Sequence, residues 1–451
     1  MQRLSKKDLL LVSFMVFSLF FGAGNLIFPP YLGQSAGTNF WQAMSGFIIS
    51  AVGLPILGVV AVAKSDGLHH LAKRVHPIFA LIFTLLIYLS IGPFLGIPRN
   101  GSLAFEMGVA PFLPTEWQQN SWILLLYTLV YFLIAFWLCL NPDKLSDRFG
   151  KVLTPSLLIL LAGIFIYSLF KPMGSFDSPI ESYVQTPYFN GFLDGYLTMD
   201  TIAALNFGIV ISVTLKQKGI KEKKSLIATT VYAGLIAGAI LVSIYVLLGY
   251  LGAVSSHMFG VAENGAQTLT NVVLYLFGKP GVILLGLVFS LACLTTSVGL
   301  ITSCSQYFAT LVPRVSYKMW VTVLALISMF FANMGLSGIL SISVPVLSAI
   351  YPLAIALIVL SFANDVLKGD SIVYVCSMLF VGIISITDAC GQVGFHSLAF
   401  DNLLRYLPMH AEGLGWIIPG VVGALLGYVI SFSKKKKGST ALQLIEKNDS
   451  C

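Results

Sequence analysis

Charged residues are scarce in this chain of 451 residues. Aspartate, glutamate, lysine and arginine together make up 10% of it, whereas a soluble domain carries about 25%. So low a content excludes a soluble globular protein, and it also excludes a long disordered chain. Hydrophobic residues make up 57%, which indicates a polytopic membrane protein.

Cysteine is also scarce, with six residues that show neither the spacing of a disulfide framework nor that of a zinc site. The six histidines form no metal-binding motif, and no ATP-binding P-loop is present. The net charge of +7 comes from short basic clusters between apolar runs. That pattern is typical of membrane topology and not of a nucleic-acid groove, so we expect no nucleic-acid partner.

Long apolar runs are what the sequence does contain. A membrane helix needs about 20 mostly apolar residues. Twelve runs approach or exceed that length, at 8–31, 40–63, 77–98, 121–140, 151–171, 191–215, 225–252, 280–311, 316–334, 338–362, 370–388 and 413–432. Because the runs are continuous and do not alternate, they predict helices and not a β-barrel. The expected fold class is an all-α polytopic membrane protein with about twelve transmembrane helices.

Loop charge supports this count. If the N-terminus is cytoplasmic, the basic residues divide 22 to 4 between inside and outside segments, the outside ones being Arg99, Lys171, Lys279 and Arg405. So strong a positive-inside bias predicts that both termini are cytoplasmic. No loop is long enough for a separate domain. We therefore expect one transmembrane domain over 1–433 and a basic cytoplasmic tail over 434–451 that lies at the lipid headgroups.

The first run is interrupted near its middle by Gly22-Ala23-Gly24-Asn25. Glycine weakens a helix, and unwound backbone at membrane depth is tolerated where it lines a cavity or is buried in protein. The freed N–H groups of a broken helix favour an anion, and its freed carbonyls favour a cation. The alternative is a patch of small residues that packs against another helix.

The sixth run, 191–215, is interrupted in a similar way and carries Asp200. A carboxylate inside a membrane span is costly and is a candidate for function. The alternative is that the helix starts later and Asp200 caps it near the outer surface. Broken helices at corresponding positions of two halves predict an inverted-repeat transporter.

The eighth run places Ala292, Thr295, Thr296, Gly299 and Ser303 roughly on one helical face. Their oxygens suit a hard monovalent cation, although hydroxyls in membrane helices more often serve packing. After the third run, 77–98, Arg99 and Glu106 are seven residues apart. We expect them to form an ion pair at the outer surface; the alternative places Arg99 in an outer vestibule.

These motifs resemble those of the bacterial branched-chain amino acid:cation symporters, the LIVCS family of the amino acid-polyamine-organocation superfamily. The resemblance covers essentially the whole chain and is carried by 21–30, by Ile97-Pro98-Arg99 with Phe105-Glu106, by 195–200 and by Thr295-Thr296-Ser297. It implies sodium-coupled import of leucine, isoleucine and valine across the bacterial plasma membrane.

The chain is also similar to the wider group with the leucine-transporter fold, through Gly22-Ala23-Gly24-Asn25-Leu26 and 292–297. That resemblance implies a five-plus-five inverted repeat with helices 1 and 6 broken. The first repeat would cover about 8–171 and the second about 191–362, and two extra helices would lie within about 370–432.

The same resemblance implies the ligands of each solute. The carbonyls of Ser18, Phe21 and Ala292 and the hydroxyls of Thr295 and Thr296 would hold one sodium ion, with Asn25 beside a second cation site. Main-chain N–H groups of Gly22, Ala23 and Gly24 would hold the substrate carboxylate. Thr198, Asp200 and Thr201 are further candidates, and Phe20 and Phe207 would line the pocket for the apolar side chain.

Three classes of function compete with this hypothesis. A proton-coupled permease would use Asp200 as the proton carrier. A membrane enzyme would show paired carboxylates or a histidine cluster near the membrane face, and the sequence has neither. A channel would fit two broken helices less well than alternating access does. We expect a transporter with an amino acid and the lipid bilayer as partners, and with no organic cofactor or obligate protein partner.

Overall fold

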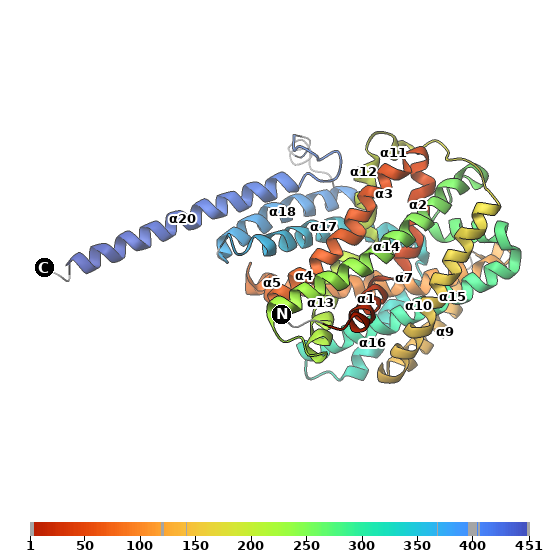
Figure 1. The fold of residues 1–451 in the computed structure, drawn as a ribbon, viewed down its shortest axis with the longest axis horizontal. Helices are drawn as coiled ribbons and strands as arrows, with labels where there is room; N and C mark the ends of the chain where they lie inside the picture. Colours follow the sequence, from red (N-terminus) through yellow and green to blue (C-terminus); the bar gives the residue numbers. More distant parts are fainter. Residues whose placement is uncertain are drawn as a thin grey trace. The chain divides into compact units, whose positions relative to one another are not determined.

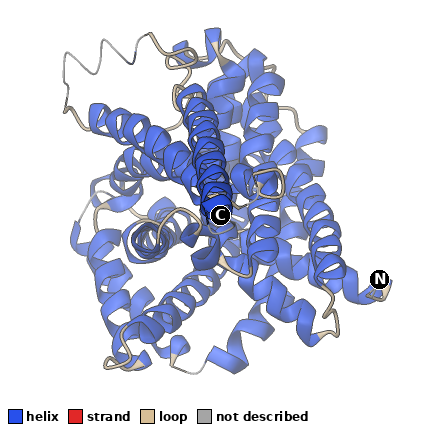
Figure 2. Ribbon diagram, turned by 90° about the vertical axis from the view of Figure 1, so that its left-hand side faces the viewer, coloured by secondary structure: helices blue, strands red, loops and turns tan. Residues whose placement is uncertain are grey.

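The computed structural model describes residues 4–118, 121–140, 142–367, 369–395, 404 and 406–448. Arg405, one of the four basic residues predicted to lie outside, and the last three residues of the predicted tail lie beyond these described residues. Within them, regular structure is helical throughout and no strand is present (Figure 2). The all-α prediction is confirmed for this part of the chain.

The helices of the first part follow the apolar runs closely. In chain order they are α1 (Lys6–Phe20), α2 (Ala23–Ala36), η1 (Gly37–Asn39), α3 (Phe40–Ile48), η2 (Ile49–Gly53), α4 (Leu54–Ser65), α5 (Leu68–Lys73), α6 (Pro77–Leu89), η3 (Ser90–Phe94), α7 (Gly96–Gly108), η4 (Ala110–Phe112), α8 (Thr115–Gln118), α9 (Ser121–Cys139) and α10 (Pro142–Phe170).

The second part is built in the same way. Its helices are α11 (Glu181–Gln185), α12 (Pro187–Asp194), η5 (Gly195–Thr198), α13 (Asp200–Gln217), α14 (Lys223–Phe259), α15 (Gly265–Leu311), α16 (Tyr317–Ala332), α17 (Gly335–Ala363), α18 (Ser371–Gln392) and α20 (Ile417–Asn448).

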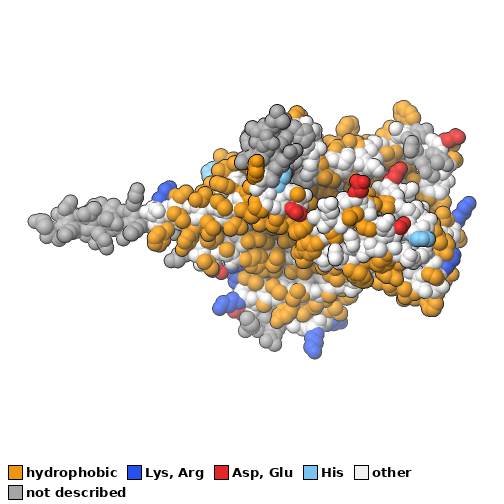
Figure 3. Space-filling view, turned by 90° about the horizontal axis from the view of Figure 1, so that it is seen from above, with side chains coloured by type: hydrophobic (Ala, Val, Ile, Leu, Met, Phe, Trp, Pro, Cys, Tyr) orange, Lys and Arg blue, Asp and Glu red, His pale blue; other side chains and the backbone are white. Residues whose placement is uncertain are grey.

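Length and hydropathy identify the helices that can cross a membrane. Eight helices among the described residues qualify, and a bent pair, Pro187–Thr198 with Asp200–Gln217, makes a ninth. Two further apolar helices, Pro155–Phe170 and Tyr317–Ala332, are shorter. Many large apolar side chains are exposed, and they dominate the visible described surface in Figure 3. Such a surface suits lipid, while the count of twelve crossings and the cytoplasmic termini stay predictions.

Both predicted helix breaks are present. α1 ends at Phe20 and α2 begins at Ala23, with Phe21 and Gly22 in extended conformations between them. The second break lies at Met199, which has a left-handed backbone with φ of 67°. The helical segments on its two sides meet at 46°. Extended or left-handed residues end the hydrogen-bonding pattern of a helix, so each break exposes backbone groups.

Contacts divide the chain into two compact units. The first comprises Met1–Val59 and Leu86–Val344, and the second comprises Val60–Leu85 and Pro345–Cys451. This division reflects contacts and not internal symmetry, so the predicted repeats stay a prediction. In the second unit α18 packs along α20, and the hydroxyl of Ser377 donates to the Gly420 carbonyl at 3.0 Å (Figure 1).

Glycines set the packing of α2 in the first unit. A Cβ on Gly33 would lie 1.9 Å from the Gly249 carbonyl oxygen of α14. A Cβ on Gly265, at the start of α15, would lie 1.7 Å from the Ile27 oxygen. Only glycine permits backbones to approach so closely. α2 is therefore held tightly against α14 and α15, which fixes the position of the first break.

Candidate functional site

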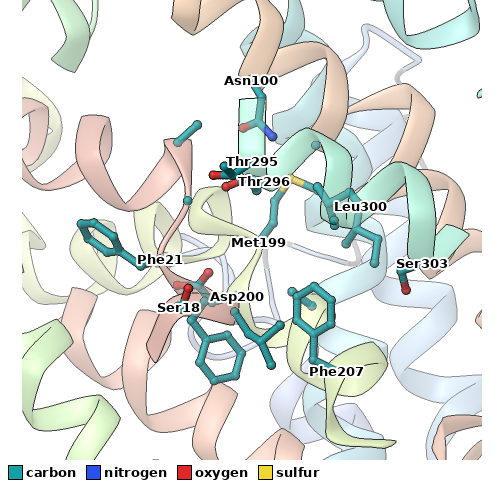
Figure 4. A pocket seen from close by; sticks show the side chains of 18 of the residues that line it. Ser18, Phe21, Asn100, Met199, Asp200, Phe207, Thr295, Thr296, Leu300 and Ser303 are labelled. Carbon is teal, nitrogen blue, oxygen red and sulfur yellow. The ribbon is translucent and has the colours of Figure 1, made fainter. Parts of the chain in front are cut away.

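Both helix breaks open on one cavity of about 430 Å³ in the first unit (Figure 4). Ligand pockets commonly measure about 300–1,000 Å³. Of the fourteen site residues predicted from the sequence, twelve line this cavity: Ser18, Phe20, Phe21, Gly22, Ala23, Asn25, Thr198, Asp200, Phe207, Ala292, Thr295 and Thr296. Gly24 and Thr201 are buried outside the lining.

The first break exposes carbonyl groups, which carry partial negative charge, and N–H groups, which carry partial positive charge. The N–H of Phe21 donates to the Phe17 carbonyl at 2.8 Å and closes the last turn of α1. The next N–H, that of Gly22, donates at 3.0 Å to Oδ1 of Asn25 and not back to α1. The carbonyl of Ser18 therefore lacks its usual helical donor, and the first N–H groups of α2 lack helical acceptors. These groups adjoin the cavity.

Asn25 connects the two breaks. Its side chain is 1% exposed, and Nδ2 donates to Oδ2 of Asp200 at 2.6 Å and to the hydroxyl of Tyr245 on α14. The Tyr245 hydroxyl also donates to the same carboxylate oxygen at 3.2 Å. Oδ1 of Asn25 accepts from Gly22 and Nδ2 donates to Asp200 and Tyr245, so the side chain that the resemblance places beside a second cation is already engaged in linking the two breaks.

Asp200 begins α13 directly after the second break. It is 3% exposed and lines the cavity. Asp200 therefore starts a helix, as the alternative interpretation has it, and its side chain is buried against a cavity, while its depth in the membrane stays a prediction. Among the described residues that line the cavity, Asp200 is the one acid and Arg99 the one base. Buried charges persist where partners compensate them. The partners of Asp200 include the Asn25 amide and the Tyr245 hydroxyl.

Arg99 is the main residue that the sequence argument misplaced. The expected ion pair with Glu106 at the outer surface is wrong, because Arg99 is 5% exposed and lines the cavity. Its Nη1 donates to the Leu197 carbonyl at 2.5 Å, and Nη2 donates to the Thr198 carbonyl at 3.4 Å. Glu106 accepts instead from Nδ2 of Asn264 at 3.1 Å. The sequence offered this position only as the alternative that placed Arg99 in a vestibule.

The two threonines of α15 form another part of the wall, which Asn100 also lines (Figure 4). Their hydroxyls donate to the Ala292 carbonyl, at 2.8 Å from Thr295 and 3.0 Å from Thr296. Each hydroxyl keeps acceptor capacity. With the nearby carbonyls of α1, they form a donor set made only of oxygen, which fits a hard monovalent cation.

Apolar side chains line much of the remainder. Phe207 is 9% exposed and Phe20 is 4% exposed. Met199, Leu300 and Ser303 also contribute to the wall (Figure 4). The sequence did not single out Asn100 or Met199, and it gave no signal for Tyr245, which stands in an ordinary apolar run. The cavity thus combines apolar surface with a few polar groups, the usual composition of a small-molecule site.

Comparison with known proteins identifies the relatives of this chain. The family model described as "Branched-chain amino acid transport protein" matches residues 5–434. The branched-chain amino acid permease BraB of Bacillus subtilis (strain 168) is 46% identical over 427 residues, which cover 94% of this chain and 96% of that protein.

Solved structures resemble the fold. Mhp1, a nucleobase-cation-symport-1 family transporter in a closed conformation with bromovinylhydantoin bound, matches with a TM-score of 0.59 and 12% identity, covering 95% of this chain and 93% of that one. MhsT in complex with L-phenylalanine matches with a TM-score of 0.55 and 18% identity, covering 95% and 99%. Both matches cover nearly the whole of each chain and have the leucine-transporter fold, so the predicted fold is confirmed.

Proposed function

This chain belongs to the branched-chain amino acid transport protein family, and we propose that it imports leucine, isoleucine and valine with sodium by alternating access. The family makes it a multi-pass transporter of branched-chain amino acids in the bacterial plasma membrane, and not an enzyme. The coupling ion, the direction and the binding residues are the parts that we propose.

The main observation in support of the proposal is that three separate structural elements line the same cavity. The break between α1 and α2, the break before α13 and the threonines of α15 all contribute to its wall. Broken helices supply N–H groups for an anion and carbonyls for a cation. A site of this kind can hold a zwitterion and an inorganic cation at the same time.

The amino acid is proposed to bind through both of its charges and its side chain. Its carboxylate accepts from the N–H groups at the start of α2, first from Ala23, which lines the cavity, since the N–H of Gly22 is already bound to Asn25. Its ammonium group faces the carboxylate of Asp200. A branched aliphatic side chain then lies against Phe20 and Phe207, where burial of apolar surface contributes about 25 cal/mol per Å².

The sodium ion is proposed to bind between α1 and α15. The carbonyls of Ser18, Phe21 and Ala292 and the hydroxyls of Thr295 and Thr296 would hold it. Such an ion links the first half of a broken span to α15, so its binding favours one arrangement of the two elements. Coupling is then the free energy by which each solute strengthens the binding of the other.

A proton-coupled permease is the second candidate, favoured by the position of Asp200. This carboxylate is the one acid among the described lining residues, and two donors contact its Oδ2. A buried carboxylate that faces a cavity can gain and lose a proton during the cycle. In that case the hydroxyls of α15 would serve packing alone.

Uptake of radiolabelled leucine into proteoliposomes separates the two candidates. We expect uptake by the wild type to need an inward sodium gradient, and Thr295→Ala to raise the half-saturating sodium concentration about tenfold, because one oxygen ligand is lost. Thr310→Ala is the matched control. Thr310 lies on the exposed part of the same helix, and its hydroxyl donates to the Tyr307 carbonyl at 2.6 Å, as Thr295 does to Ala292.

The other results lead to different conclusions. Uptake driven by a proton gradient alone, with no effect of Thr295→Ala, would exclude the sodium site and favour Asp200 as the carrier. Absence of leucine uptake under either gradient would contradict the proposed substrates.

A further inference from the structure

The helical segment before the second break, Pro187–Thr198, ends in the backbone carbonyls of Leu197 and Thr198. η5 ends at Thr198, and the left-handed residue Met199 turns the chain before α13 starts. The carbonyl end of a helical segment carries a partial negative charge. In a broken membrane helix, such an end is suited to an inorganic cation.

A side chain of the protein is already bound there. The guanidinium of Arg99, which comes from α7, donates to the carbonyls of Leu197 and Thr198, the last two residues of η5 that precede Met199. An arginine stays charged at every physiological pH. The end of this half-helix therefore has a cation that cannot exchange with the solution.

The surroundings are shaped for this guanidinium. Its Cζ lies 5.6 Å from the centre of the Phe28 ring on α2, within the range of a cation–π contact. A Cβ on Gly24 would lie 2.8 Å from Nη2 of Arg99 and 3.2 Å from Cα of Thr198. Gly24 thus leaves the space that Arg99 fills, which explains its place outside the cavity lining.

The first break differs because its carbonyl end faces the cavity and not a basic side chain. The carbonyl end of α1 adjoins the cavity beside Thr295 and Thr296, and the side chain that caps the break, Asn25, contacts the N–H side through Gly22. No basic residue apart from Arg99 is among the described residues that line the cavity. The carbonyl end of α1 is therefore the one at which an ion from the solution can bind.

We propose that Arg99 is a resident cation of the broken sixth span, that it positions η5 against α2, and that transport consequently uses one solution cation for each amino acid. This inference rests on the proposed function, coupled transport through the same cavity. Because the transported amino acid is a neutral zwitterion, one net positive charge should move with each molecule.

Chemical rescue tests the role of Arg99. In proteoliposomes, Arg99→Ala should lower leucine uptake at least about tenfold, because two charge-assisted hydrogen bonds to η5 are lost. Millimolar guanidinium added on both sides should restore much of that uptake by binding in the vacated space. Arg314→Ala, which removes an exposed arginine between α15 and α16, should leave uptake unchanged and insensitive to guanidinium.

Charge counting on the wild type tests the stoichiometry without any substitution. The membrane potential at which net leucine flux reverses, measured at fixed gradients of leucine and of the coupling cation, should correspond to one charge per leucine. This measurement counts charge whether the ion is sodium or a proton.

The outcomes separate the two proposals. Absence of leucine uptake by the wild type contradicts the proposed function. Wild-type uptake accompanied by two charges per leucine overturns the inference about Arg99. The same conclusion follows if Arg99→Ala transports normally, or if it elutes as a folded protein yet gains nothing from guanidinium. If Arg99→Ala fails to fold, the charge count on the wild type decides.

Discussion

The break between α1 and α2 presents backbone groups to the cavity, whereas the break before α13 has its carbonyls bound by Arg99 from within the protein. The first uses two extended residues, Phe21 and Gly22, and caps only its N–H side with Asn25. The second uses one left-handed residue, Met199, and the charged Arg99. A broken helix therefore does not by itself create an ion site.

What differs is the origin of the compensating charge. An ion that binds from solution can couple its gradient to transport. The guanidinium of Arg99 is part of the protein, so it can fix the position of η5 but cannot be transported. Asn25 joins the two breaks, since it contacts Gly22 on one side and Asp200 on the other. A substitution at one break should consequently alter the other break as well. The loss of leucine uptake caused by substitutions at each break measures how much each one contributes to transport.

The largest effect is expected from Asp200→Asn. This change keeps the shape of the side chain but removes the negative charge that faces the proposed ammonium position. Loss of the charged partner of a buried ammonium group costs about 3–5 kcal/mol, so leucine uptake should fall on the order of 100-fold or more. Uptake into proteoliposomes under a sodium gradient measures this loss.

Exchange distinguishes the two roles of Asp200. If the carboxylate holds the ammonium group, exchange of internal for external leucine should fall as far as net uptake does. Preserved exchange with loss of gradient-driven uptake would contradict that role and favour Asp200 as a proton carrier.

A smaller effect is expected from Gly24→Ala. The new Cβ would lie 2.8 Å from Nη2 of Arg99, so the guanidinium must move away from η5. Overpacking of this kind costs about 1–3 kcal/mol, and leucine uptake should fall about tenfold. Gly163→Ala is the matched control, because nothing lies within 4 Å of a Cβ there.

The double variant Gly24→Ala with Arg99→Ala sharpens this test. If Gly24 matters because it makes room for Arg99, then the alanine at 24 should have little further effect once Arg99 is absent. Additive losses in the double variant would indicate that Gly24 acts independently, for instance through its own N–H group.

The smallest effect is expected in the second unit, which contains neither break. Asp365, just beyond the end of α17, pairs with Lys64 at 2.8 Å, and its side chain is 77% exposed. The hydrogen bond from Lys64 lowers the pKa of Asp365. A lowered pKa means that the stabilisation is present above the ordinary value of about 3.9 and is lost as the pH falls further, through the pKa of the folded protein.

Asp365→Asn should therefore leave leucine uptake unchanged and lower Tm at neutral pH by less than about 1 °C, because exposed ion pairs contribute little. The difference in Tm from the wild type should shrink at acidic pH. A loss of uptake comparable to that of Asp200→Asn would show that removal of any carboxylate is harmful, and the comparison between the two breaks would then carry no information.

Local sequence patterns were sufficient to predict much of the fold and part of the cavity lining. Glycine and asparagine in the apolar run at 21–30 predicted the first break, because these residues do not sustain a helix at membrane depth. Asp200 drew attention to the second break because a carboxylate is costly in lipid. The pairing of Thr295 with Thr296 on one helical face followed from helical geometry, and both line the cavity.

The errors have a common physical cause. The spacing of Arg99 and Glu106 suggested a pair within one helix, but spacing reports only neighbours on the same element. The partners of Arg99 are backbone carbonyls 98 and 99 residues away. Tyr245 was missed for the same reason, since its hydroxyl meets Asn25 and Asp200 across 220 and 45 residues.

Composition, local backbone preference and motifs within short segments were enough to identify the membrane class, the apolar runs, the positions of both breaks and the family. That Arg99 is bound to the second break and that Asn25 links the two breaks became visible with the packed helices. Such contacts depend on which helices pack together, and in this protein close glycine contacts of α2 with α14 and α15 decide that.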